Sequence, residues 1–487
     1  MNTEKKDKNL ERMVALPVSV RTKLAILAAG MLSFLGILVE TSMNVTYPIL
    51  IHEFHTALSL VQWVTTGYLL LVTIVMACSA FILRRFSAKS VFLFAALHFV
   101  VGSLFCALSS DFLLLMIGRL LQAVSTGLST PLMFHIILNK VPSRRLGTYT
   151  GLASMIIALA PALGPVYGGV MTTALSWRYI FWLAMPVGVC VLLLGMATIS
   201  LLAAGNHAAF DYLGVVVLAA LLTSIVVAFN EAGRHGWGSM DFIWLLLSAA
   251  VLATFFVIHV RTSRSTLLNF SILRVLPVTL GAVNYFSLQF VNIGISFVLP
   301  IFAQTVLGTN ALVAGLLLLP GSLLGAAVSP VAGRLFDRIG GFWPILAGDG
   351  SMAVGCLLFW QFTANLLPIT VLIFYLFLRL GFNFGFGNTL TASALELPKQ
   401  KRADVNALFN MLQQYAGSVG TSVLAALIAA HERILPVGQN ALATRLGAHD
   451  DFLLLLILAT LGVFSTVLIR YRKRHSGSPL TAGDQSL

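Results

Sequence analysis

The sequence predicts an all-α polytopic membrane protein of fourteen transmembrane helices, arranged as two six-helix bundles with two further helices inserted between them. Three observations predict this fold: the composition, the length of the apolar runs, and the alternation of basic residues between loops. Of the 487 residues, 58% are hydrophobic and only 10% are charged, whereas an ordinary soluble domain has about 25% charged residues. A soluble core cannot bury that much apolar side chain, so nearly the whole chain is expected in the membrane.

Apolar runs of about 20 residues recur along the chain, which is the length that a helix needs to cross the hydrocarbon. The first run is too long for a signal peptide and is followed by no small-residue cleavage site. The expected helices lie at 24–47, 58–82, 90–108, 111–138, 147–173 and 179–203, then at 210–230 and 241–260, and then at 275–300, 312–332, 343–361, 366–392, 404–430 and 451–470.

These helices give a five-part organisation. A cytoplasmic leader at 1–23 precedes the first bundle at 24–203. Two extra helices with their linkers occupy 204–274, the second bundle occupies 275–470, and a cytoplasmic tail follows at 471–487.

The basic residues alternate from one predicted side to the other. Of the 30 Lys and Arg residues, 24 fall in loops and termini on one side, four fall on the other, and Arg119 and Arg379 lie within helices. Because basic loops stay in the cytoplasm, both termini are predicted to be cytoplasmic in a multi-pass protein of the cell membrane. A net charge of +13 also raises the possibility of a nucleic-acid partner. The loop distribution explains this charge by itself, so we expect lipid bilayer and no nucleic acid.

Two pairs of matching segments indicate an internal duplication. AFILRRFS at 80–87 resembles GRLFDRIG at 333–340, and RLLQAVSTG at 119–127 resembles RLGFNFGFG at 379–387. The offsets, 253 and 260 residues, are nearly equal, as one duplication of a helical bundle requires. The expected helices seven and eight are therefore an insertion between the two halves.

The second copy of the loop predicts a cytoplasmic latch made by Gly333, Asp337 and Arg338. Glycine permits a tight turn, and the two charged residues can pair with each other, with a neighbouring helix end or with headgroups. The alternative is a topology signal only. That alternative is favoured for the first copy, where Arg84 replaces the acid and Ser87 the glycine.

Few ionisable residues fall inside the expected helices, and each needs a reason because a charge in the hydrocarbon costs about 2.5 to 3.5 kcal/mol even on insertion scales. Glu40 and Arg119 are expected about 10 Å and about 12 Å below the outer surface, from the helical rise. We predict that this pair couples proton occupancy to helix position. The alternative is a static buried ion pair. Asp349 and Glu396 are secondary proton candidates, both expected to be wetted from the cytoplasmic side.

Polar residues share faces of four expected helices at helical spacing. They predict a central substrate cavity, with interhelical hydrogen bonding without substrate contact as the alternative. The predicted cavity residues are Asn44, Gln122, Thr126, Tyr285, Gln289, Asn292, Asn410 and Gln413.

The fifth expected helix carries APALGPVYGG at 160–169. Its small residues permit close helix approach, and its prolines remove backbone donors and bend the helix. We predict a hinge or a seal against the other half, with ordinary packing as the alternative. The residues concerned are Pro161, Gly164, Pro165, Gly168 and Gly169.

Together these motifs resemble the fourteen-helix drug:proton antiporter family of the major facilitator superfamily, the quaternary-ammonium resistance type. The resemblance rests on LVETSMNVTYP at 38–48, RLLQA at 119–123, ALGPVYGG at 162–169, SWRYIFWLAMPVG at 176–188, FDYLG at 210–214 and GRLFDRIG at 333–340. It implies the major facilitator fold and drug export driven by proton entry. It also matches Glu40 to the family's helix-one acid, Arg119 to its helix-four arginine, and Gly164, Pro165, Gly168 and Gly169 to its antiporter signature.

The expected function is therefore a proton-coupled antiporter that exports small hydrophobic or cationic compounds by alternating access, driven by the proton gradient and without a cofactor. A transporter or flippase of an endogenous amphiphile (a lipid, bile acid or peptide) on the same fold is the alternative. A membrane enzyme is disfavoured because no loop is long enough for a catalytic domain and no catalytic triad or metal-ligand cluster is visible. A channel is disfavoured by the duplication. We expect protons and a small molecule as ligands, and a monomer.

Overall fold

The computed structural model describes residues 18–142, 146–200, 211–263, 270–398, 401–436 and 438–475. Most of the predicted leader, the tail beyond residue 475, and the basic residues Arg144, Arg145, Arg264 and Lys399 lie outside this part. Within it, fourteen α-helices have 20 residues or more and no strand occurs. The predicted all-α fold class is confirmed.

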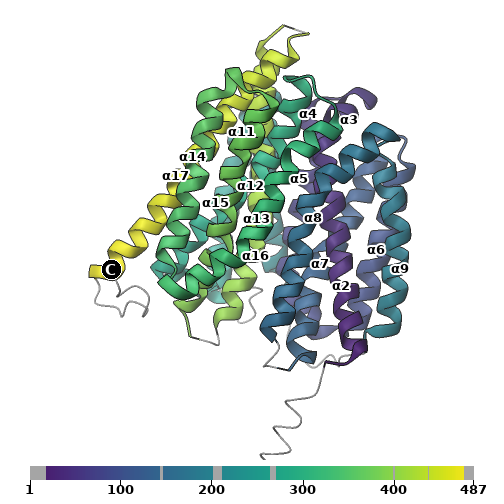
Figure 1. The fold of residues 1–487 in the computed structure, drawn as a ribbon, viewed down its shortest axis with the longest axis vertical. Coiled ribbons are helices and arrows are strands. Elements are labelled where there is room, and N and C mark those ends of the chain that lie inside the picture. Colours follow the sequence, from purple (N-terminus) through teal and green to yellow (C-terminus); the bar gives the residue numbers. More distant parts are fainter. Residues whose placement is uncertain are drawn as a thin grey trace, which may run out of the picture.

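The first six long helices form one bundle (Figure 1). They are α2 (Val20–Ser42), α5 (Trp63–Arg85), α6 (Ala88–Leu108), α7 (Phe112–Lys140), α8 (Leu146–Ala174) and α9 (Tyr179–Thr198). The short elements η1 (Met43–Val45), α3 (Tyr47–Glu53) and α4 (Leu58–Val61) connect α2 to α5. Each helix makes its backbone hydrogen bonds within the segment, so its polar backbone groups need no partner in the lipid.

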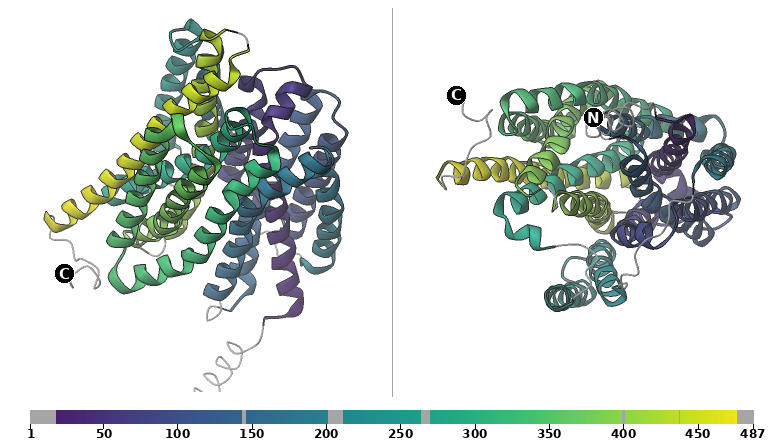
Figure 2. Two further views of the ribbon diagram at one scale, coloured as in Figure 1. Left: turned by 45° about the horizontal axis from the view of Figure 1, so that its top comes forward. Right: turned by 90° about the horizontal axis from the view of Figure 1, so that it is seen from below.

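The last six long helices form the second bundle: α12 (Leu276–Thr305), α13 (Ala311–Ile339), α14 (Phe342–Phe362), α15 (Pro368–Leu395), α16 (Arg402–Ile434) and α17 (Asn440–His475). The short 3-10 helix η3 (Phe270–Arg274) precedes α12, and the short 3-10 helix η4 (Thr363–Asn365) follows α14. The inserted pair, α10 (Tyr212–His235) and α11 (Met240–Thr262), pack on each other, and α10 packs on α16 and α5. Figure 2 shows this pair standing beside the two bundles.

Twelve of the long helices are long and apolar enough to cross a membrane, and the two others are α8 and α16. Those two have 29 and 33 residues, respectively, enough length for a span. Both lie where the bundles meet, since α8 packs on α13 and α16 packs on α5. The start of α2 and the end of α17 lie at the same end of the molecule (Figure 1), as an even number of spans requires. The structure is consistent with fourteen spans, and that count stays a prediction.

The bundles are joined near the end away from the termini, called the outer end below. The Thr66 and Thr421 hydroxyls lie 2.6 Å apart, and the Ser418 hydroxyl donates to the Thr66 carbonyl at 2.9 Å. The Gln304 amide donates to the Val45 carbonyl at 3.0 Å. Toward the other end the helices of the two bundles splay apart (Figure 2). In this conformation the two bundles thus contact each other at the outer end.

Glycines let α14 and α15 pack backbone to backbone. A Cβ added at Gly348 would lie 2.6 Å from the Gly385 nitrogen and 2.8 Å from the Gly381 carbonyl oxygen. No heavy atom lies within 4 Å of a Cβ added at Gly350. The two glycines share one helix and differ in what they meet.

We expect Gly348→Leu to lower the free energy of unfolding by about 1 to 3 kcal/mol, because the side chain must push two backbones apart. Thermal unfolding in detergent, followed by tryptophan fluorescence, measures the change. Gly350→Leu is the matched control and should unfold like the wild type. Equal losses in the two variants would contradict close packing of α14 on α15.

Candidate functional site

Arg119 lies at the centre of the first bundle, on α7, with its side chain fully buried. Its Nε donates to the Val64 carbonyl at 3.2 Å and its Nη1 donates to Gln122 Oε1 at 3.0 Å. The guanidinium also stacks over the Tyr68 ring, 4.2 Å from its centroid. Its Nη2 is buried and has no hydrogen-bond partner. Arg119 therefore keeps the N–H donors of Nη2 available for a further acceptor.

Glu40 lies on α2 with 7% of its surface exposed. Arg119 acts on its carboxyl group electrostatically, so the two predicted partners are neighbours. Within the described residues, however, no ion pair joins them, and no hydrogen bond to the Glu40 carboxyl group is recorded. The static ion pair considered from the sequence is not formed in this conformation. A buried acid near a cation, without a direct contact, can change its protonation without breaking a salt bridge.

Tyr68 ties this centre to the neighbouring helices. Its hydroxyl lies 2.6 Å from the Thr126 hydroxyl and donates to the Gly36 carbonyl at 3.1 Å. A Cβ added at Gly36 would lie 1.9 Å from Thr126 Oγ1. Three helices thus converge on one aromatic hydroxyl, because only glycine at position 36 leaves room for the threonine.

Two predicted cavity residues of the first bundle are engaged in local hydrogen bonds. Asn44 is buried and accepts from the Tyr47 hydroxyl at 3.0 Å. Gln122 is buried, and its amide donates to the Ser103 hydroxyl of α6 at 2.9 Å. Gln122 therefore faces a helix of its own bundle. The structure favours interhelical hydrogen bonding for this residue, and the substrate contact stays a prediction.

In the second bundle, polar residues of α12 reach α16 and α15. The Tyr285 hydroxyl donates to Gln413 Oε1 at 3.3 Å, and its ring stacks on Phe386 with centroids 4.2 Å apart. Asn292 accepts a hydrogen bond from Arg379. Gln289 is buried with its Oε1 unpartnered, and Asn410 is half-buried. Four helices of the two bundles thus carry polar side chains, as the helical spacing predicts.

The signature of α8 packs on two sides. A Cβ at Gly164 would lie 1.9 Å from Thr41 Oγ1, and a Cβ at Gly168 would lie 2.4 Å from the Ser42 carbonyl oxygen, both on α2. A Cβ at Gly169 would lie 2.7 Å from the Ala311 carbonyl oxygen on α13. Gly315 of α13 in turn meets the Pro165 carbonyl oxygen, at 2.3 Å from an added Cβ.

The contacts of α8 with α13 cross from one bundle to the other, and they lie near the outer end, where α13 begins. Pro161 lies on the same helix, one turn before Pro165, and is half-buried. A side chain at Gly169 or at Gly315 would hold the two bundles apart. This arrangement is the one that a seal needs.

The predicted latch residues lie at the end of α13. Asp337 and Arg338 are exposed and Gly333 is half-buried. No heavy atom of a described residue lies within 4 Å of a Cβ added at Gly333. In the described part of the chain, no ion pair of Asp337 or Arg338 is recorded. The latch therefore stays a prediction, and no ion pair of this kind closes it in this conformation.

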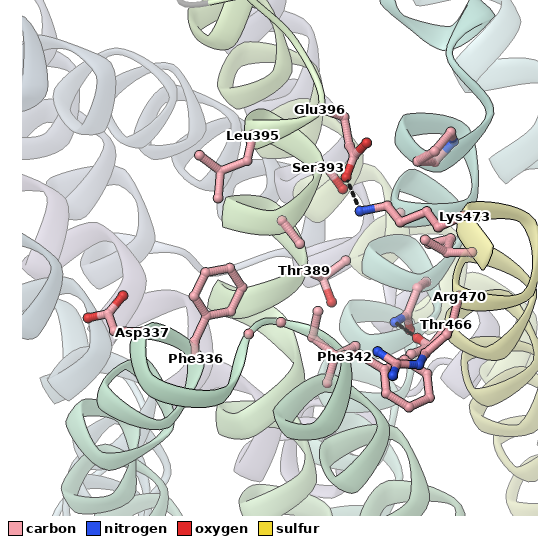
Figure 3. Close-up of a pocket in the computed structure, with 18 residues that line it drawn as sticks. Phe336, Asp337, Phe342, Thr389, Ser393, Leu395, Glu396, Thr466, Arg470 and Lys473 are labelled. Atoms are coloured by element: carbon pink, nitrogen blue, oxygen red, sulfur yellow. Dashed lines mark hydrogen bonds and ion pairs between the residues drawn. The ribbon is translucent and has the colours of Figure 1, made fainter. Parts of the chain in front are cut away.

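A cavity of about 340 Å³ opens in the second bundle between α12, α13, α14, α15 and α17 (Figure 3). Asp337 and Glu396 line it, and Glu396 is paired with Lys473. Asn284 and Thr466 also line it, and they donate to Asp349 Oδ2 at 3.0 Å and 2.6 Å. The cavity therefore reaches the hydrogen-bond partners of one secondary proton candidate and the side chain of the other.

Asp349 itself is 1% exposed, so the expectation that it is wetted directly is wrong. The position of a residue near a helix end does not expose it when neighbouring helices cover that end. Glu396 keeps 25% of its side chain exposed, in agreement with the expectation.

Two charged residues within the second bundle are not among the predicted site residues. The sequence places Arg379 inside a helix without predicting a role for it, and the structure shows that it is buried, with 7% of its surface exposed. Asp451 was placed at the start of the last helix, whereas α17 begins at Asn440 and Asp451 is fully buried. The polar stretch at 440–451 hid the first three turns of that helix from a search for apolar runs.

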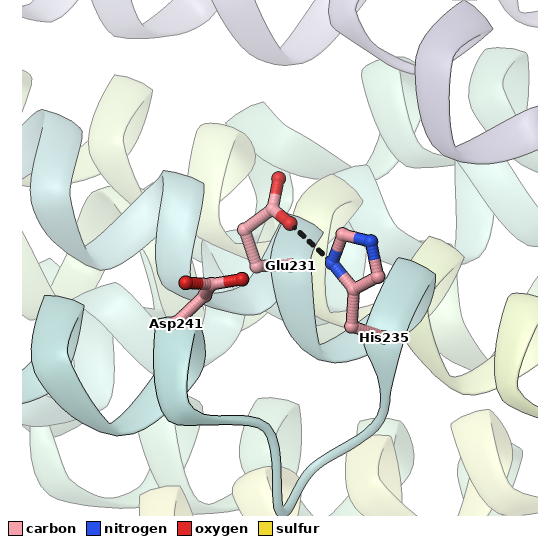
Figure 4. A group of neighbouring side chains, drawn as sticks. All are labelled: Glu231, His235 and Asp241. Atoms are coloured by element: carbon pink, nitrogen blue, oxygen red, sulfur yellow. Dashed lines mark hydrogen bonds and ion pairs between the residues drawn. The ribbon is translucent and has the colours of Figure 1, made fainter.

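Glu231, His235 and Asp241 form a group whose ligand atoms lie within 4.8 Å of one another at the α10–α11 turn (Figure 4). The sequence predicts no metal site. His235 Nδ1 pairs with Glu231 at 2.7 Å, and Arg234 pairs with the same carboxylate at 3.3 Å. Asp241 lies in the first turn of α11, where the helix dipole favours an acid. These ordinary roles account for the three side chains, and we assign no metal to them.

A family model described as Major Facilitator Superfamily matches residues 29–421. The chain belongs to the Major Facilitator Superfamily. It is therefore a multi-pass membrane transporter and not an enzyme.

Among the relatives of this superfamily member are drug-resistance proteins. It is 30% identical over 450 residues to the lincomycin resistance protein LmrB of Listeria monocytogenes, covering 91% of this chain and 96% of that protein. It is 29% identical to LmrB of Bacillus subtilis, covering 92% and 95%. It is 26% identical to the putative multidrug resistance protein MdtD of Escherichia coli, covering 85% and 88%.

Solved structures of the superfamily share the fold. A bacterial homolog of the human lysosomal transporter Spinster, inward-facing and unoccupied, superposes with a TM-score of 0.68 at 14% identity, covering 93% of this chain and 99% of that chain. The peptide transporter POT in complex with sulfate gives 0.62 at 17% identity, covering 91% and 95%. At these identities the likeness establishes the fold alone.

We expect Gly169→Val to weaken the outer seal of this transporter. Overpacking costs about 1 to 3 kcal/mol, and a cost borne only by the sealed state shifts the equilibrium about 5- to 150-fold. Distances between spin labels at the outer ends of α8 and α13 should lengthen. Val170→Leu, at an exposed neighbour on the same helix, is the control. An unchanged distance distribution in Gly169→Val would show that this contact does not hold the bundles together.

Proposed function

We propose that this transporter is a proton-coupled antiporter that exports small hydrophobic or cationic compounds by alternating access. Glu40 binds the coupling proton, and the Arg119 guanidinium responds electrostatically to the charge of the Glu40 carboxyl group. Protons and the exported compound are the ligands, the proton gradient is the driving force, and the working unit is a monomer with both termini in the cytoplasm.

One observation carries the proposal: Glu40 is a buried acid without a hydrogen bond or ion pair, within electrostatic reach of Arg119. Ionisable residues inside a membrane bundle are costly and are retained for function by default. An acid locked in a salt bridge would resist protonation, because the bridge favours the charged form. Glu40 is not locked in this way, so it can exchange its proton during a transport cycle.

Arg119 supplies the response to that exchange. When Glu40 is ionised, the buried guanidinium and its unpartnered Nη2 are attracted to the carboxylate. When Glu40 is protonated, the attraction is lost and Arg119 keeps its bonds to Val64 and Gln122 on α5 and α7. Proton occupancy on α2 thereby changes the free energy of helix positions in the same bundle. The ligand shifts the equilibrium because it interacts differently with the two states.

The contact between the bundles at one end of the molecule and the exposed charged residues at the other end support alternating access. The contact of α8 with α13 joins the bundles at the outer end, while Asp337 and Arg338 at the other end are exposed. Sealing at one end with an unengaged latch at the other is the arrangement of a transporter that opens to the cytoplasm. Engagement of the latch accompanies the opposite state.

The energy available is sufficient. A proton moving down a potential of 100 mV releases about 2.3 kcal/mol, and one pH unit adds about 1.4 kcal/mol. One proton per cycle therefore sustains a concentration gradient of more than tenfold for a neutral compound.

The drug-resistance names of the relatives support a foreign compound as the substrate. Lincosamide antibiotics and lipophilic cations are the first compounds to test. Asp349 and Glu396 are proposed as secondary proton sites next to the cavity of the second bundle, and Glu396 takes up a proton only when its ion pair with Lys473 opens.

We expect Glu40→Gln to abolish uptake that is driven by a pH gradient into proteoliposomes, while substrate exchange without a gradient continues. The amide keeps the shape of the side chain and cannot release a proton. Glu40→Asp keeps the carboxyl group and should retain part of the driven uptake. Uptake of labelled lincomycin and of a cationic dye under an imposed gradient measures the effect.

Asp241→Asn is the control, because this acid lies at an exposed helix start and should transport like the wild type. Driven uptake that survives Glu40→Gln would refute the assignment of Glu40. Uptake of a lipid, bile acid or peptide in place of drugs would replace the substrate class with an endogenous amphiphile.

A further inference from the structure

Asp451 is a second buried acid, in the other bundle from Glu40. Its side chain on α17 is fully buried, and both carboxyl oxygens lack a hydrogen-bond partner. It is the one acid among the described residues for which both oxygens are buried and unpartnered. This residue has no part in the packing arguments above or in the proposed cycle.

No cation neutralises Asp451 from the helices that cover it. The helix α17 packs on α12, α14 and α16. The sequence of α12 contains no charged residue, and the single charge of α14 is Asp349, near its other end. At the outer end of α16 lie His431, Glu432 and Arg433, and α17 itself adds Arg445, His449 and Asp450. None of these groups forms an ion pair with Asp451 among the contacts of the described residues.

A buried carboxylate without a partner pays a desolvation cost of several kcal/mol. The carboxyl group avoids that cost by holding a proton. Burial without a partner therefore favours the neutral form of the Asp451 carboxyl group in this conformation.

Three ionisable side chains lie near Asp451 at the surface, and no hydrogen bond among the described residues joins them to its carboxyl group. Asp450, the preceding residue, keeps 44% of its side chain exposed and pairs with His431 Nε2 at 2.8 Å. His449 Nδ1 lies 3.4 Å from the other oxygen of Asp450. Asp450 also acts on Asp451 electrostatically. All three side chains are partly exposed and meet water at the end of the molecule where α17 begins.

We propose that Asp451 is a second proton-binding site of the transport cycle, loaded from the outer surface through the cluster of His431, His449 and Asp450. A proton passes from external water to this cluster and on to the Asp451 carboxylate. Rearrangement of the second bundle then exposes Asp451, and the proton leaves to the cytoplasmic side. This inference rests on the proposed proton coupling and adds a site in the bundle that Glu40 does not serve.

Protonation of the Asp451 carboxyl group can be measured in the purified protein, without a transport assay. Infrared difference spectra of the purified protein in lipid, taken across a pH titration, report the carbonyl stretch of protonated carboxyl groups. We expect Asp451→Asn to remove one component of that absorption at neutral pH, and Asp241→Asn to remove none. Spectra of Asp451→Asn that match the wild type would overturn the assignment, whatever the transported substrate is.

The coupling is measured in proteoliposomes. One proton fewer per cycle lowers the largest sustainable accumulation by about tenfold for each pH unit of gradient, so Asp451→Asn should accumulate about tenfold less substrate at one pH unit. Exchange without a gradient should continue, which shows that the variant is folded. Asp451→Glu keeps the carboxyl group and should restore accumulation.

Equal accumulation in Asp451→Asn and the wild type would overturn the second site, and so would equal loss in the asparagine and glutamate variants. The two proposals fail differently. If the wild type shows no gradient-driven uptake, both the proton coupling at Glu40 and the second site are refuted. If uptake depends on Glu40 and Asp451→Asn has no effect, only the second site is refuted.

Discussion

The cost of leaving polar groups unpaired in hydrocarbon is the constraint on which the rest of this structure depends. It forces the chain into long helices, because a helix makes all its backbone hydrogen bonds within one segment. It also makes each ionisable side chain inside the bundles an exception. Arg119 meets the constraint with two hydrogen bonds and an aromatic face. The carboxyl groups of Glu40 and Asp451 have no hydrogen bond recorded among the described residues, and in the proposed cycle a bound proton meets the constraint for them.

Glycine provides the second means of packing in a membrane, where helices gain nothing from excluding lipid tails of equal polarity. Small residues allow backbones to approach closely and gain dispersion contacts. Gly164 and Gly168 place α8 on α2, and Gly169 with Gly315 places it on α13. The same helix therefore belongs to one bundle by one face and joins the other bundle by an adjacent face. A helix in that position can transmit a change at Glu40 on α2 to the contact between the bundles.

The two bundles distribute their charges differently despite the shared architecture. In the first bundle a buried arginine accompanies the buried acid. In the second, Arg379 bonds Asn292, Asp349 Oδ2 accepts from Asn284 and Thr466 while its Oδ1 has no partner, and Asp451 has no cation paired with it among the described residues. The duplicated arginines at 119 and 379 are thus retained with different partners. Divergence of the partners rather than of the arginines gives each half its own electrostatic character.

The sequence by itself determined the class of the protein, its helices and the halves they form, because apolar length and the placement of basic residues act locally along the chain. It also identified Glu40, Arg119 and the glycines of α8, since a charge or a small-residue repeat within an apolar run is visible without a fold. Burial depends on neighbours that are distant in the chain. Only the tertiary structure therefore decided that Asp349 is covered, that Gln122 faces α6, and that Glu40 and Arg119 do not touch. It alone revealed Asp451, because three helices from separate parts of the chain enclose a carboxyl group that the sequence places at the end of an apolar run.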